Sequence, residues 1–182
     1  MINFLKRIRR SLIASSLKNK AKRRCKRLHI DYVDGVYLGE NIQKWGDVKV
    51  ILGKNARIGS NTVLWGTGII VIGENSHVGE ESWIYSNING GVTIGSDVNI
   101  AARLYIIDSN HKFEKGKLIR EQDLESEHIY IGDDVWIGAN VTIIKGARIG
   151  NGCVVGAASL VNKAFPDNSI IGGVPAKILK TR

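Results

Sequence analysis

Proline and cysteine are scarce in this 182-residue chain, and long apolar runs are absent. Acidic side chains are missing from its first 28 residues. Its two cysteines, Cys25 and Cys153, lie far apart and in no metal-ligand spacing, which favours a reduced, cytoplasmic protein over a disulfide framework. No run of about 18 apolar residues exists that could span a bilayer, and charges interrupt the segment where a signal peptide needs an apolar stretch. We therefore expect neither secretion nor a membrane-spanning helix.

The first 28 residues contain no acidic side chain but hold eleven of the 26 basic ones. The rest of the chain carries 15 basic and 17 acidic residues, a net of −2, so the formal charge of +9 belongs to an arm. Residues 2–27 predict a basic amphipathic helix, because apolar residues recur at near-helical spacing. The apolar residues of this stripe are Ile2, Phe4, Leu5, Ile8, Leu12, Ile13 and Leu17. Such a helix can lie on an anionic membrane face or pack on the body or on a neighbouring subunit, and both readings stay open.

A six-residue repeat of an aliphatic residue followed by glycine dominates the chain from about Leu52. Because strand side chains alternate between faces, the aliphatic residue and the residue two before it should both point inward. The positions two before it hold only small or β-branched residues: Ala56, Thr62, Ser76, Ser82, Val98, Val135, Val141, Ala147, Cys153 and Ser159. Glycine suits a corner that needs positive φ or close backbone approach. The pattern predicts an all-β solenoid, a parallel β-helix of hexapeptide repeats.

Residues 108–130 interrupt the repeat with polar and charged residues and predict a surface loop, where function tends to lie. We expect three parts: an arm over 1–30, a β-helix over 31–165 that contains this loop, and a tail over 166–182. Nucleic-acid binding is not expected, since only the arm is basic and it lacks stacking aromatics.

The chain resembles the hexapeptide-repeat acyltransferases, in particular the maltose, galactoside and polysaccharide O-acetyltransferases. The resemblance covers about residues 50–180 and depends on the hexads, on Asn110-His111, on the segment 131–138 and on the segment 172–177. It implies a left-handed coil, a homotrimer with active sites between subunits, and acetyl-CoA as co-substrate with no metal required. The expected reaction is direct transfer of the acetyl group to a hydroxyl of a sugar or polysaccharide precursor.

Transfer to a hydroxyl requires a base, and the resemblance assigns that role to His111. Asp108 is a candidate to orient its imidazole, a role that a backbone carbonyl could equally fill. The resemblance also implies coenzyme contacts, at Trp136, Ala139, Ala157, Asn162, Lys163, Lys177 and Lys180. Trp83, Tyr85 and Asn87 are candidates for the acceptor site, and Trp136 could instead be an interface aromatic.

Three alternatives stay open at this point. The same base and coenzyme groove would serve an N-acetyltransferase of an amino-sugar nucleotide. A zinc hydratase of the γ-carbonic anhydrase type needs three converging histidines, and no close inward-facing pair accompanies His111. A non-catalytic scaffold is disfavoured by the tail residues that match coenzyme contacts.

The basic arm favours a polysaccharide or lipid-linked precursor at the inner membrane face, with the protein itself cytoplasmic.

Overall fold

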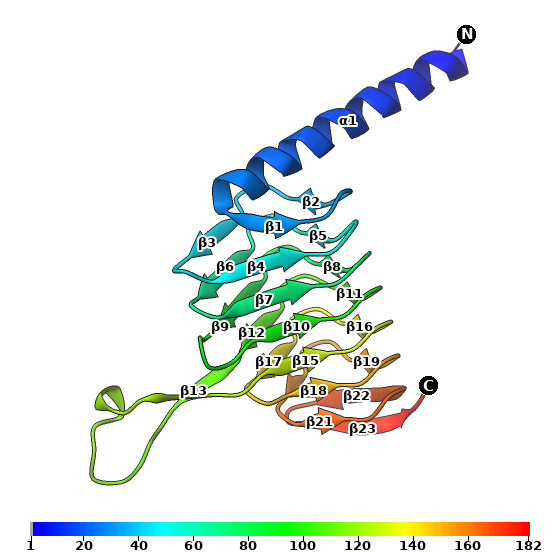
Figure 1. The fold of residues 1–182 in the computed structure, drawn as a ribbon. Coiled ribbons are helices and arrows are strands. Elements are labelled where there is room, and N and C mark those ends of the chain that lie inside the picture. The colour runs from blue at the N-terminus through cyan, green and yellow to red at the C-terminus, as the bar shows by residue number, and fades with distance from the viewer. Residues whose placement is uncertain (1) are drawn as a thin grey trace.

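The computed structural model describes the backbone of residues 2–182 and the side chains of residues 15–182. One helix, α1 (Ile2–Leu28), precedes a left-handed parallel β-helix in the shape of a triangular prism (Figure 1). Each turn of the coil contributes one short strand to each of three parallel sheets. The fold class and the helical arm predicted from the sequence are confirmed, and the coil begins earlier than the clear repeat, at Ile30.

The three sheets form the faces of the prism. The first sheet contains β1 (Ile30–Tyr32), β4 (Lys49–Leu52), β7 (Ile69–Ile72), β10 (Val92–Ile94), β15 (Ile129–Ile131), β18 (Arg148–Ile149) and β21 (Ala164–Phe165). The second contains β2 (Tyr37–Leu38), β5 (Arg57–Ile58), β8 (His77–Val78), β11 (Asn99–Ile100), β16 (Trp136–Ile137), β19 (Val154–Val155), β22 (Ser169–Gly173) and the antiparallel β23 (Ala176–Thr181). The third contains β3 (Gln43–Trp45), β6 (Val63–Gly66), β9 (Trp83–Ser86), β12 (Tyr105–Ile107), β17 (Thr142–Ile144) and β20 (Leu160–Val161).

The interior of the prism is filled as the hexads predict. All ten small or β-branched positions named above are buried. The aliphatic residue two places after each of them is buried too, as at Ile58, Ile137 and Ile143. Pairing partners lie 20 residues apart near the N-terminus, as with Val50 and Ile70, and 18 apart at Trp136 and Val154. The apolar core is therefore one continuous column along the coil axis.

The hexad glycines before Gly156 serve close approach between turns and not positive φ. A Cβ added to Gly59 would lie 2.4 Å from the backbone nitrogen of Glu80 on the next turn, and the hexad glycines have no positive φ. The left-handed backbone falls two residues later, at Asn55 and Asn61 for example, where asparagine tolerates it. Of the two reasons that favoured glycine, stacking of the turns is the one that holds here.

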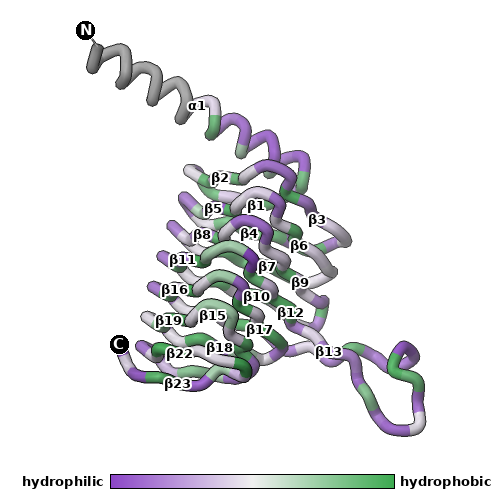
Figure 2. The backbone as a smooth tube through the Cα atoms, turned by 180° about the vertical axis from the view of Figure 1, so that it is seen from behind, coloured by the Kyte–Doolittle hydropathy of each residue, from purple (hydrophilic) through white to green (hydrophobic). Residues whose placement is uncertain are grey.

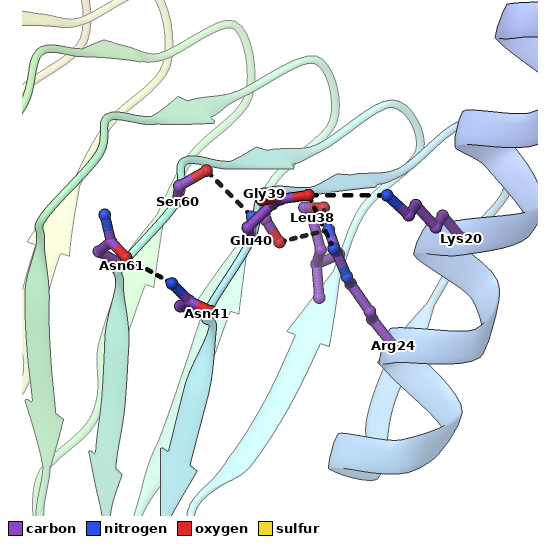
Figure 3. Close-up of polar contacts among 8 residues, drawn as sticks. All are labelled: Lys20, Arg24, Leu38, Gly39, Glu40, Asn41, Ser60 and Asn61. Carbon is purple, nitrogen blue, oxygen red and sulfur yellow. Dashed lines mark hydrogen bonds and ion pairs between the residues drawn. The ribbon is translucent and has the colours of Figure 1, made fainter.

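The C-terminal part of α1 covers the open N-terminal end of the prism. Ala21 and Cys25 are buried there, and burial raises the pKa of the Cys25 thiol to about 11. Arg24 donates hydrogen bonds to the carbonyl oxygens of Leu38 and Gly39, and Lys20 and Arg24 both pair with Glu40 (Figure 3). The end of a solenoid needs such a cap, because its last turn would otherwise expose apolar side chains. Leu17, the last residue of the proposed apolar stripe, is exposed, and the stripe residues from Ile2 to Ile13 lie outside the described side chains.

Candidate active site

The predicted loop is a β-hairpin that projects from one edge of the prism (Figures 1 and 2). It leaves after β12 and returns at β15, and its strands β13 (Ser109–His111) and β14 (Leu124–Ser126) pair antiparallel, with a 3₁₀ turn, η1 (Ile119–Glu121), near the tip. We call the edge between the third and first sheets the loop edge; it also contains residues 87–91, 145–147 and 162–163. His111 lies opposite Leu124 in the hairpin and is exposed.

Two contacts hold the base of the hairpin. The Glu127 amide donates to the Asp108 carbonyl oxygen at 2.9 Å and closes the hairpin at its base, and Lys145 Nζ, on the prism, lies 2.6 Å from Glu125 Oε1. The Lys145 ammonium group lowers the pKa of Glu125 below its usual range. His111 therefore lies on a hairpin that is fixed at its base. The outer part of the hairpin, residues 110–120, is exposed throughout.

Asp108 is fully buried and points into the prism side of the loop edge. The backbone N–H of Asn87 donates to both carboxylate oxygens, at 2.9 and 3.0 Å, and the backbone N–H of Gly91 donates to Oδ2 at 2.7 Å. Burial raises the pKa of Asp108, while the Asn87 and Gly91 amides and the Ser86 hydroxyl act in the opposite direction. Within the described side chains these bonds hold the 87–91 turn, and none of them joins Asp108 to His111.

Of the expected acceptor residues, two lie in an aromatic group on the third sheet and Asn87 borders it. Trp83 is exposed, Tyr85 is half-buried, and the Asn87 side-chain amide lies 3.4 Å from the Tyr85 hydroxyl. Three further aromatics join this group that sequence reasoning missed: Trp45, Trp65 and Tyr105. The Trp65 and Tyr85 ring centroids are 5.0 Å apart in an edge-to-face arrangement. A hollow lies among Trp65, Trp83, Tyr85 and Tyr105.

The candidate coenzyme residues around Trp136 lie on the opposite side of the third sheet. Ala139 and Ala157 stack one turn apart at the edge between the second and third sheets, which we call the alanine edge; the Ala158 amide donates to the Ala139 carbonyl at 2.9 Å. Trp136, on the adjoining second sheet, has 57 % of its surface exposed. Its strand is three pairing steps from β23, roughly 14 Å at the usual strand spacing.

The four remaining candidates separate into two places. Lys177 and Lys180 are exposed on β23 of the second sheet, and no acid pairs with either within the described part of the chain. Asn162 and Lys163 lie on the loop edge, with Lys163 Nζ 5.6 Å from the centre of the Phe165 ring. In one chain, therefore, His111, Asn87 and Lys163 occupy the loop edge, while Trp136 and Ala139 lie beyond the width of the third sheet.

Metal ligands do not gather among the residues that the structure describes: no group of three or more His, Cys, Asp or Glu side chains suits a metal ion there. His128, the histidine at the end of the hairpin, contacts Thr93 Oγ1 through Nε2 at 2.8 Å. Across the described residues, no helix is both long and apolar enough to cross a membrane.

Two protein-family models match the sequence of the coil. Residues 128–163 match "Bacterial transferase hexapeptide (six repeats)", and residues 49–79 and 69–107 match "Hexapeptide repeat of succinyl-transferase". The chain belongs to the hexapeptide-repeat transferase family. Among the family's proteins, one from Escherichia coli named as a lipopolysaccharide biosynthesis O-acetyl transferase, WbbJ, is 45 % identical over 49 % of this chain and 50 % of its own length. The galactoside O-acetyltransferase of E. coli is 37 % identical over 49 % of this chain and 43 % of its own length.

Solved structures extend the likeness of the fold to most of the chain. The N-acyltransferase AntD from Bacillus cereus, crystallised with dTDP and 3-hydroxybutyryl-CoA, superposes with a TM-score of 0.78 at 24 % identity and covers 88 % of both chains. At that identity the likeness concerns the fold alone. The chain spans about half the length of the curated relatives named above.

Proposed function

We propose that this protein transfers the acetyl group of acetyl-CoA to a hydroxyl of a sugar or glycan precursor. The observation that carries the proposal is the hairpin at the loop edge, which breaks the regular coil of a hexapeptide-repeat transferase and presents an exposed His111. The O-acetyltransferase names of the relatives at 37–45 % identity support a hydroxyl as the acceptor.

The reaction needs one base and no covalent intermediate on the protein. The His111 imidazole takes the proton of the acceptor hydroxyl as its oxygen attacks the thioester carbonyl carbon. The carbon–sulfur bond then breaks, and the coenzyme thiolate takes the proton from the imidazolium. Histidine suits this role because its imidazole can both accept and donate a proton near neutral pH.

The residues of the alanine edge and the tail fit a coenzyme. At Ala139 and Ala157 a pantetheine arm could approach the backbone, because the side chains are methyl groups on neighbouring turns. Lys177 and Lys180 offer exposed ammonium groups for phosphate, and Asn162 and Lys163 offer a second polar group on the loop edge. In this proposal the exposed Trp136 ring covers the thioester end of the coenzyme.

The decisive test incubates the purified protein with acetyl-labelled acetyl-CoA and a panel of sugars, amino-sugar nucleotides and lipid-linked glycans. We expect label in an alkali-labile O-acetyl ester of one sugar class. Label only in an alkali-stable amide of an amino-sugar nucleotide would establish the N-acetyltransferase alternative instead. No transfer to any acceptor, with hydrolysis no faster than in buffer, would contradict the proposal.

We further infer a homotrimer whose active sites lie between subunits. Within one chain the third sheet separates His111 from the alanine edge, although both lie near the level of β12 and β17. Three apolar side chains of the hairpin, Phe113, Leu118 and Ile119, are 56–76 % exposed. Large exposed apolar groups are typical of interfaces, so a hairpin packed on the next copy would bring His111 of one chain to Ala139 of another.

Subunit mixing tests this arrangement. His111→Ala removes the base, and Ala157→Trp fills the coenzyme approach on the alanine edge; each variant alone should be inactive. Co-refolded mixtures should regain activity, since some sites then combine an intact hairpin with an intact alanine edge. Mixtures that stay inactive, although light scattering shows three chain masses, would contradict shared sites.

We also infer that α1 brings the protein to an anionic membrane face from the cytoplasmic side. Four basic residues, Lys6, Arg7, Arg9 and Arg10, precede the part of the helix that packs on the prism. Each basic residue near an anionic surface contributes about 1 kcal/mol. Deleting residues 1–14 keeps Ala21 and Cys25 in place as the cap. This deletion should abolish sedimentation with phosphatidylglycerol vesicles; unchanged sedimentation would remove the inference.

A further inference from the structure

The buried Asp108 carboxylate is explained by neither the core nor the proposed chemistry. No Lys, Arg or His side chain pairs with it in the described part of the chain, and a buried charge without such a partner is costly. Its compensation comes from the backbone amides of Asn87 and Gly91. Charged acceptors form the stronger class of hydrogen bond, so this carboxylate fixes the turn more firmly than a neutral side chain would.

The turn fits around the carboxylate closely. A Cβ added to Gly90 would lie 2.3 Å from Asp108 Oδ2, so the turn contacts the carboxylate with no space for a side chain. The Gly90 amide also donates to the Asn87 carbonyl at 3.0 Å, which closes the turn on itself. The positions of residues 87–91 therefore depend on a group in the following turn of the coil.

The turn also lies next to the aromatic hollow. It follows β9, in which the Tyr85 ring lines the hollow and the Tyr85 hydroxyl contacts Asn87. Asp108 precedes His111 by three residues, roughly 10 Å of extended chain. One carboxylate thus joins the base of the hairpin to the strand end that borders the hollow.

We propose that Asp108 is a positioning residue that holds the Asn87–Gly91 turn as a wall of the acceptor site. The inference rests on the proposed function for the identity of the acceptor, and it replaces the orienting role toward His111. Asparagine at position 108 would present one oxygen and one NH₂ group to the two backbone amides of Asn87 and Gly91, so one acceptor oxygen would be replaced by a donor. The turn would then loosen, and acceptor binding would weaken while the alanine edge keeps its geometry.

Steady-state kinetics separates this role from a general loss of structure. For Asp108→Asn we expect the acceptor KM to rise about tenfold, the effect of one unsatisfied buried hydrogen-bonding group. The acetyl-CoA KM should stay within about twofold, since in the described part of the chain the Asp108 carboxylate bonds to Asn87 and Gly91 and to none of the candidate coenzyme residues. Asp97→Asn is the matched control: it removes an exposed carboxylate that accepts one side-chain amide bond elsewhere on the coil, and should change neither constant. Equal rises in both KM values, or a fall in kcat alone, would overturn the proposal.

Hydrogen exchange measures the turn itself without any acceptor. The Asn87 and Gly91 amides should exchange at least tenfold faster in Asp108→Asn, with exchange in β15 and β17 unchanged. If Asp108→Asn does not fold, Gly90→Ala provides the same test, because its methyl group displaces the turn and keeps the charge. Unchanged exchange at both amides in the folded variant overturns the positioning role even if the wild-type protein proves to transfer no acetyl group.

Discussion

The prism and its hairpin are built in opposite ways. The side chains that point into the prism are almost without solvent contact, whereas residues 110–120 of the hairpin are all exposed, Phe113 among them. The prism is fixed by repetition, since each turn stacks on the last, while the hairpin is held only at its base. Stability should therefore depend on the interior of the prism, and proton transfer on the hairpin. A substitution inside the prism should leave turnover unchanged, and a substitution of His111 should leave stability unchanged.

The strongest test of this division is His111→Ala. Loss of a positioned general base should lower the turnover number about 10²–10⁴-fold. The unfolding free energy should change by no more than about 0.5 kcal/mol, because the side chain is exposed. Turnover and chemical unfolding measure the two effects. His77→Ala, on the second sheet, is the control, and near-normal turnover of His111→Ala would remove the base from the mechanism.

The converse change lies in the prism. Ile143 is completely buried in β17, and Ile143→Ala should lower the unfolding free energy by about 2–5 kcal/mol through lost burial and the cavity that remains. Activity per folded molecule should persist below the unfolding temperature. Phe113→Ala in the hairpin is the matched apolar truncation. We expect it to leave the unfolding free energy of the single chain unchanged, because the Phe113 side chain is exposed. Equal losses in the two variants would contradict the division.

The sequence predicted the prism better than the hairpin because the prism follows local rules. Alternation within a strand and a period of six place Ala56 or Val141 inward without any knowledge of distant contacts. The first turn, which precedes the clear repeat, carries the same signal, since Val36 precedes Leu38-Gly39 with the same spacing. The reason for the glycines needed the structure, because the close contact of Gly59 is with a turn about 20 residues away.

The role of Asp108 shows where sequence reasoning stops. Its closeness to His111 in the chain suggested that it orients the imidazole. In the structure its carboxylate bonds to Asn87 and Gly91, 21 and 17 residues earlier. Which of several nearby partners a buried carboxylate takes depends on the stacking of turns. The aromatics that join Trp83 and Tyr85 on the third sheet were missed for the same reason. Trp45 and Trp65, for example, become neighbours of Tyr85 only when β3, β6 and β9 pair.

A pair of glycines gives a smaller effect within the prism alone. A Cβ on Gly138 would lie 2.6 Å from the Ala157 nitrogen, whereas the nearest atom to a Cβ on Gly156 is 3.5 Å away. Gly138→Ala should therefore cost about 1–3 kcal/mol by forcing two turns apart, and Gly156→Ala should be nearly neutral. Thermal unfolding of the two variants side by side measures the difference. Similar melting temperatures would mean that the turns can separate without strain.

The smallest effect is expected at the base of the hairpin, where the two regions meet. Lys145→Met removes the ammonium group that pairs with Glu125, and trypsin should then cleave among residues 112–120 several-fold faster than in Lys163→Met, with the melting temperature unchanged. Because the pairing lowers the pKa of Glu125 in the folded state, its contribution is present above the ordinary pKa of a glutamate. It is lost as the pH falls through the lowered value. The difference between the two variants should therefore disappear in acid, as probed by pepsin cleavage; a difference that persists below that range would mean that the hairpin is anchored by something other than this ion pair.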